Sequence, residues 1–79
     1  LLDDRTGMVR AAAARALGEQ GAWTTATALL ALLEDTSWLV RRESALALRR
    51  MGGVGHLTLR RALNASNSFA ADMARQVLD

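Results

Sequence analysis

The chain has 79 residues, enough for one small domain, and a formal net charge of +2 in which every cation is an arginine. It has no cysteine, no proline and one histidine, which excludes disulfides, cysteine-based zinc sites and metal centres built from several imidazoles. Hydrophobic residues make up 51% of the chain and are mostly alanine and leucine, which are strong helix formers. The composition therefore predicts an all-α domain stabilised by apolar packing.

The first predicted helix spans residues 7–19, where apolar residues recur at helical spacing. Thr6 or Asp4 is available as its N-cap, and Gly18 or Gly21 marks its end. We expect its inward stripe to consist of Val9, Ala13, Ala16 and Leu17.

Four further helices are predicted over 23–33, 38–51, 54–63 and 69–78, separated by short polar or glycine-containing turns. Their expected inward residues, in chain order, are Ala26, Leu29, Leu30, Leu33, Val40, Ser44, Ala47, Leu48, Leu59, Leu63, Ala70, Ala74, Val77 and Leu78. Helices of this length joined by short turns are expected to pack as antiparallel neighbours.

The chain repeats itself. The pattern of residues 1–17 returns over 32–48, and it returns a third time one residue closer, with Leu48 matching Leu78. Such self-similarity indicates stacked helical units, none of which can bury its apolar face alone. We therefore divide the single domain, residues 1–79, into repeat units of approximately 1–21, 22–52 and 53–79.

The stretch 16–21, Ala-Leu-Gly-Glu-Gln-Gly, followed by Leu29, by Leu33-Glu34-Asp35 and by Val40-Arg41, resembles the HEAT-repeat family, especially the short HEAT-like repeats of the phycobilin-lyase type. This resemblance covers essentially the whole chain. It implies a right-handed α-solenoid fragment of antiparallel helix pairs, about two and a half repeats long. It also implies that helices 23–33 and 54–63 are convex, and that helices 7–19, 38–51 and 69–78 line the concave side.

The resemblance further implies a structural ladder. The family has an aspartate in the turn and an arginine at the start of the second helix. The turn aspartate corresponds to Asp4 and Asp35, and the arginine corresponds to Arg10 and Arg41. A carboxylate beside a helix N-terminus meets unpaired N–H groups, and a nearby guanidinium can bridge it to the adjacent repeat. In the third unit these positions are Ala65 and Ala71, so we expect the ladder to stop there.

The outward positions of the second helices carry the candidate partner-binding residues, which are Arg15, Arg42, Leu46, Arg49, Arg50 and Arg75. The acidic residues Glu19, Glu43 and Asp72 lie among them. Two interpretations are open: a solvated face of mixed charge, or a groove for an acidic peptide or a phosphate backbone. Exclusive use of arginine is also typical of codon bias in a GC-rich genome.

Three other features have structural interpretations. His56 is an incidental residue at a helix start, and the glycine-rich segment 52–55 is a turn, because no strand precedes it as a phosphate loop would require. Trp23 and Trp38 are expected to pack in the core or at its edge; if exposed, they are candidate interface anchors.

No set of catalytic residues and no cofactor site is recognisable, so the sequence predicts a non-enzymatic scaffold that holds a protein partner on its concave face. The alternative is nucleic-acid binding through the arginine-bearing face, which the small net charge disfavours. A third alternative, an accessory subunit of a bilin-lyase-like enzyme, rests on the resemblance alone.

The remaining expectations concern location and assembly. There is no apolar stretch of the ~20 residues needed to cross a bilayer and no signal peptide, so we expect no membrane association and a cytoplasmic location. Leu1-Leu2 aligns with a helix end, which suggests a piece of a longer array that self-associates through its exposed ends.

Overall fold

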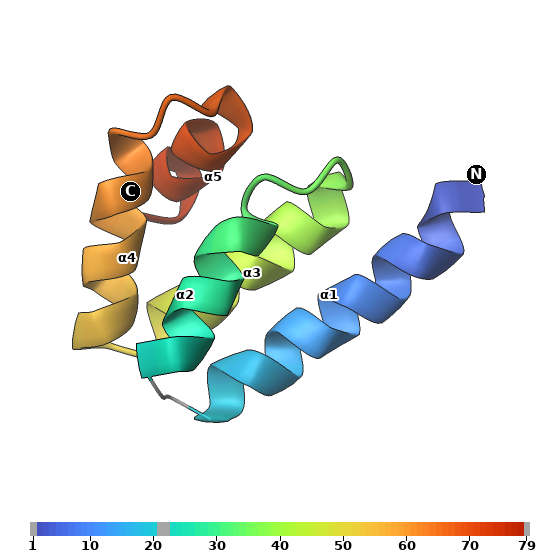
Figure 1. Cartoon of the computed structure of the whole chain (residues 1–79), viewed down its shortest axis with the longest axis horizontal. Coiled ribbons are helices and arrows are strands. Elements are labelled where there is room, and N and C mark those ends of the chain that lie inside the picture. Colours follow the sequence, from blue (N-terminus) through green and yellow to red (C-terminus); the bar gives the residue numbers. More distant parts are fainter. Residues whose placement is uncertain (1, 21–22, 79) are drawn as a thin grey trace.

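The computed structural model describes residues 2–20 and 23–78, with side chains for 6–19 and 23–78 (Figure 1). Within these residues the chain forms helices α1 (Leu2–Gln20), α2 (Trp23–Leu32), α3 (Trp38–Arg50), α4 (Gly53–Leu63) and α5 (Ser68–Leu78), and no strand. The all-α fold class predicted from composition and periodicity is confirmed.

The helices form two layers. Helices α1, α3 and α5 lie in one layer and α2 and α4 in the other, and α3 contacts all four other helices (Figure 1). The helices alternate between the two layers in chain order. This stacking of helix pairs is the arrangement of an α-solenoid, as the repeat pattern predicted.

The core lies between the layers around α3. Leu29 and Leu33 from the α2 side, Leu48 from α3 and Leu59 from α4 are completely buried. The predicted inward residues of α3 are all buried, and the Ser44 hydroxyl donates a hydrogen bond to its own helix at the Val40 carbonyl, over 2.7 Å. Burying this hydroxyl therefore leaves no unsatisfied donor.

One inward residue of α4 was predicted wrongly. Leu63 lies at the surface, and Ala62 is buried in its place. The buried residues of this helix are Gly55, Thr58, Leu59 and Ala62, a stripe that passes one position before Leu63. Leu63 consequently lies about 100° around the helix from the buried Ala62.

Helix α1 begins earlier than predicted, at Leu2, so neither Thr6 nor Asp4 is an N-cap, and it continues past Gly18. Gly21 lies outside the described residues. Residues 2–6 contain no helix breaker, so a turn there needs a partner to hold it. In the second unit Arg10 holds the turn at Asp35.

The inward stripe predicted for α1 was wrong at Val9, Ala13 and Ala16, whereas Leu17 is partly buried against the core. Val9 is 65% exposed, and Ala13 and Ala16 are exposed as well. The buried residues of the described part of α1 are instead Gly7, Ala11 and Ala14. Among the described residues, α1 packs mainly against α3 and α2, and Val9 lies on a part of α1 that these helices leave exposed.

Two glycines allow helices to approach α3 closely. A Cβ atom added at Gly18 of α1 would lie 2.6 Å from the Cβ atom of Ala47, closer than real Cβ contacts. A Cβ atom added at Gly55 of α4 would overlap the carbonyl oxygen of Leu48. The close packing of α1 and of α4 against α3 therefore requires glycine at these two positions.

Side-chain caps begin the two helices that follow polar turns. Ser37 Oγ accepts a hydrogen bond from the Val40 N–H over 3.4 Å, and Asn67 Oδ1 accepts one from the Ala70 N–H over 3.0 Å. We expect Asn67→Ala to lower the free energy of unfolding by about 1 kcal/mol, because the Ala70 N–H loses its acceptor. Urea denaturation followed by circular dichroism measures this. Asn67→Asp, which keeps the acceptor, is the control, and an equal loss in both variants would contradict the capping role.

Candidate interaction surface

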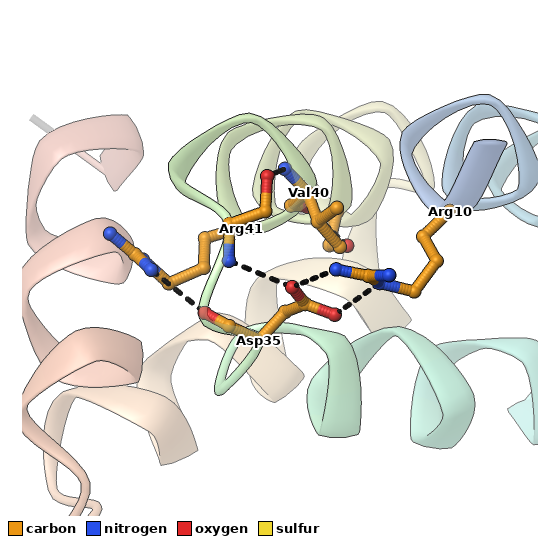
Figure 2. A network of polar contacts seen from close by, with 6 residues as sticks. Arg10, Asp35, Val40 and Arg41 are labelled. Atoms are coloured by element: carbon orange, nitrogen blue, oxygen red, sulfur yellow. Dashed lines mark hydrogen bonds and ion pairs between the residues drawn. The ribbon is translucent and has the colours of Figure 1, made fainter. Parts of the chain in front are cut away.

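An ion pair joins α1 to the turn between α2 and α3 (Figure 2). Arg10 Nε donates to Asp35 Oδ2 over 2.7 Å, and Arg10 Nη2 donates to Asp35 Oδ1 over 2.9 Å. Two parallel hydrogen bonds of this kind are the strongest form of arginine–carboxylate contact. The Asp35 side chain is only 12% exposed, whereas the Arg10 side chain is 38% exposed, so only the carboxylate is largely shielded from solvent.

Asp35 also organises its own turn. Its Oδ1 accepts a hydrogen bond from the Ser37 N–H over 2.8 Å, and its backbone carbonyl accepts one from Arg41 Nη1 over 2.7 Å. The hydrogen bonds from Arg10 lower the pKa of the Asp35 carboxyl below its ordinary value. The Ser37 N–H and the charges of Arg10 and Arg41 act in the same direction, while burial opposes them.

The ladder residues Arg10 and Asp35 bridge adjacent units, whereas Arg41 contacts Asp35 in a different way from Arg10. Arg10 reaches the carboxylate of Asp35 in the following unit, and Arg41 binds the Asp35 backbone rather than its side chain. The side chain of Asp4 lies outside the described residues. The Arg41 guanidinium also lies 4.2 Å from the centroid of the Phe69 ring. Because Ala65 stands at the position equivalent to Asp35, the next unit offers Arg41 an aromatic face instead of a carboxylate.

The outer face of α3 carries four of the candidate residues. Arg42, Arg49 and Arg50 are exposed there, and Leu46 is half-buried. Arg15 of α1 is exposed beside them. We call these five residues the arginine surface. Arg75 lies on α5, where it forms an exposed ion pair with Asp72 over 3.3 Å.

Glu43 connects the two helices of the arginine surface. Glu43 Oε1 lies 3.7 Å from Arg15 Nη1 of α1, and Glu43 Oε2 lies 3.8 Å from Arg42 Nη1 of α3. The residue is 9% exposed, whereas the sequence placed it among the exposed acidic residues. Its spacing of three residues from buried Val40 and four from buried Ala47 was the signal for burial.

Both tryptophans are exposed and neither lies in the core, so the alternative stated for exposed tryptophans, an interface anchor, is the one that applies to them. Trp38 is 53% and Trp23 is 59% exposed. Trp38 is the first residue of α3, and its ring centroid lies 5.7 Å from the Arg42 guanidinium carbon. The spacing of Trp38, Arg42 and Arg49 places them on one stripe of the helix. The structure thus adds an aromatic residue to the arginine surface.

The described part of the chain contains neither a cluster of metal ligands nor a membrane-spanning helix. No cluster of three or more histidine, cysteine, aspartate or glutamate residues is present there to hold an ion. Nor does this part contain a helix with the length and apolarity that a bilayer crossing requires. His56 Nδ1 lies 3.0 Å from the Gly52 carbonyl oxygen, a local contact at the start of α4.

Two layers of stacked helix pairs, joined across units by an arginine–aspartate pair, define the chain as an α-solenoid fragment. A family model described as HEAT repeats matches residues 1–79. The chain therefore belongs to the HEAT-repeat family. No curated protein and no solved structure matches it.

Proposed function

We propose that this protein is a non-catalytic scaffold that binds a protein partner on the layer formed by α1, α3 and α5, the layer that the HEAT architecture makes concave. HEAT repeats commonly serve as protein-interaction scaffolds. The observation that carries the proposal is the exposure of Trp38 beside Arg42 on the outer face of the central helix. Tryptophan and arginine are enriched among the residues that dominate binding energy at protein interfaces.

The position of this surface also supports the proposal. Helix α3 packs against all four other helices, so its outer face is presented on the most firmly held element of the fold. A rigid surface loses little conformational entropy on binding. The half-buried Leu46 adds apolar area between the arginines, which a partner side chain can cover.

Nucleic-acid binding is the second candidate. Residues 44–71 contain four arginines and no acidic residue, which favours an anionic ligand for this part of the chain. The net charge of +2 is small for a protein that neutralises several phosphates. We therefore rank this candidate below protein binding. The proposal also includes a cytoplasmic location and self-association through the ends of the solenoid; the exposure of Met8 and Val9 on α1 supports the second of these.

Photocrosslinking tests which face binds. A photoreactive amino acid in place of Leu46 reports on the arginine surface, and one in place of the exposed Thr27 of α2 reports on the opposite layer. We expect a crosslinked protein only with the first probe. Arg42→Glu combined with Arg49→Glu is expected to abolish the crosslink, because reversed charges repel an acidic partner.

The matched control is Arg60→Glu combined with Arg61→Glu, the same charge change in the last turn of α4. We expect this control to keep the crosslink. Retention of the partner by the Arg42/Arg49 variant would contradict binding by the arginine surface. A crosslinked nucleic acid whose yield falls steeply with added salt would replace the proposal by its alternative.

A further inference from the structure

We propose that Arg15 and Arg42 form a carboxylate clamp that docks an acidic side chain of the partner, with Glu43 as the internal carboxylate that occupies the clamp when no partner is bound. This inference rests on the proposed function and names the chemistry of the partner: a protein segment in which a glutamate or aspartate is flanked by apolar residues.

The arginine–carboxylate contacts at Asp35 and at Glu43 differ in their nitrogen–oxygen distances. Arg10 and Asp35 approach to 2.7 Å and 2.9 Å and form two hydrogen bonds. Around Glu43 the shortest nitrogen–oxygen distances are 3.7 Å and 3.8 Å, beyond hydrogen-bond length. The contact at Asp35 is a hydrogen-bonded structural pair. At Glu43 one carboxylate lies near two guanidinium groups without forming a hydrogen bond to either of them.

The two guanidinium groups have donors to spare. The side chains of Arg15 and Arg42 are 54% and 48% exposed, so both are open to solvent, while the Glu43 side chain is 11% exposed beneath them. A guanidinium carries five N–H donors in a planar fork that matches a carboxylate. An incoming carboxylate can therefore bridge the two arginines from the solvent side without displacing the helices that carry them.

The surroundings of the clamp favour a peptide carboxylate over a phosphate backbone. Trp38 lies beside Arg42, and Leu46 lies on the same face of α3, so apolar surface adjoins the two cations. Glu19 on α1 and Asp72 on α5 are exposed acidic residues on the flanking helices. A continuous row of phosphates would meet these carboxylates, whereas an isolated acidic side chain flanked by apolar residues meets complementary groups.

The two tryptophans provide the readout. Trp38 lies beside the clamp on α3 and Trp23 lies on α2 in the opposite layer, with similar exposure. In a nitrogen–proton correlation spectrum each indole N–H gives its own signal. The proposed test is a titration of the protein with a short, end-blocked peptide of glutamate and leucine. We expect the Trp38 indole signal to shift while that of Trp23 stays in place, and the same peptide with glutamine in place of glutamate to bind more weakly.

Three variants locate the site. Arg15→Gln combined with Arg42→Gln is expected to weaken peptide binding by about tenfold or more, because charge-assisted hydrogen bonds are lost. Arg60→Gln combined with Arg61→Gln makes the same charge change on α4 and is expected to leave affinity unchanged. Glu43→Gln removes the internal competitor at nearly constant shape, so we expect several-fold tighter binding. Circular dichroism on each variant confirms that the helices are retained.

Several results would overturn the clamp, and the first three come from the variants and the control peptide. They are an equal loss of affinity in the Arg60/Arg61 control, equal binding of the glutamine peptide, and weaker binding by a folded Glu43→Gln variant. If the crosslinked partner still depends on the arginine surface while the peptide shifts no signal, the clamp is wrong and the scaffold function stands. If an oligothymidylate shifts Trp38 with higher affinity than the peptide, both proposals fail in favour of nucleic-acid binding.

Discussion

Replacing Gly55 by alanine is expected to lower the free energy of unfolding by about 3 kcal/mol, the largest loss we expect from any glycine-to-alanine substitution in this chain. The new Cβ atom would overlap the carbonyl oxygen of Leu48, a backbone atom in the completely buried part of α3. A backbone carbonyl cannot rotate away as a side chain does, so α4 would have to move off α3. A domain of this size is stabilised by only about 0.1 kcal/mol per residue, so the loss is a large share of the total.

Gly53 supplies the matched control two residues earlier on the same helix. A Cβ atom added there meets no atom within 4 Å, and its φ angle is not positive, so alanine fits without strain. We expect Gly53→Ala to raise the free energy of unfolding by about 0.5 kcal/mol, because alanine restricts the unfolded chain. Urea denaturation of both variants makes the comparison. Equal effects of the two substitutions would show that close helix contact at Gly55 does not determine stability.

The second large effect is expected at the buried ion pair. Asp35→Ala removes the acceptor for Arg10 and for the Ser37 N–H at once. We expect the free energy of unfolding at neutral pH to fall by about 2–3 kcal/mol, because the carboxylate that accepts from a charged donor and from a backbone donor is lost. Partial exposure of Arg10 keeps the loss at the lower end of what breaking a buried pair costs.

The pH dependence of stability follows from the same pair. The pKa of Asp35 is lowered in the folded protein, so its contribution is present in full above the ordinary aspartate pKa of about 3.9. It is lost as the pH falls through the lower, folded value, because the unfolded chain binds the proton more readily. We expect the stability difference between wild type and Asp35→Asn to be largest near neutrality and to shrink below about pH 4.

Urea midpoints for both proteins across this pH range measure the difference, and the other carboxylates cancel because both chains carry them. Arg10→Gln is the complementary control. If Arg10 is the main cause of the lowered pKa, the Arg10→Gln background removes most of the pH dependence attributed to Asp35. A stability difference that stays constant down to low pH would contradict the assigned role.

Helix positions were predictable where the local pattern and the tertiary neighbours agree. Val40 and Leu48 of α3, and Ala70 and Ala74 of α5, were placed inward by periodicity and are buried. Their helices have packing partners on the expected side. The same periodicity wrongly placed Val9 in the core. The sequence of a repeat indicates which face of a helix can be buried, but it does not show whether another helix covers that face.

The candidate surface was predictable in part. The arginines of α3 lie on its outer face as the spacing indicated, but the position of Glu43 beneath Arg15 and Arg42 depends on how α1 packs against α3. The exposure of Trp38 was missed because a large aromatic residue ordinarily indicates a core position.

The amino-acid sequence by itself determined the all-α class, the repeat and the four completely buried leucines, Leu29, Leu33, Leu48 and Leu59, because these follow from local propensity and from a period that each segment carries on its own. Only the tertiary structure decided which arginine binds Asp35, where α1 begins and which arginines share Glu43. Those outcomes depend on distances between helices from different repeat units, and such distances are set by packing across the stack.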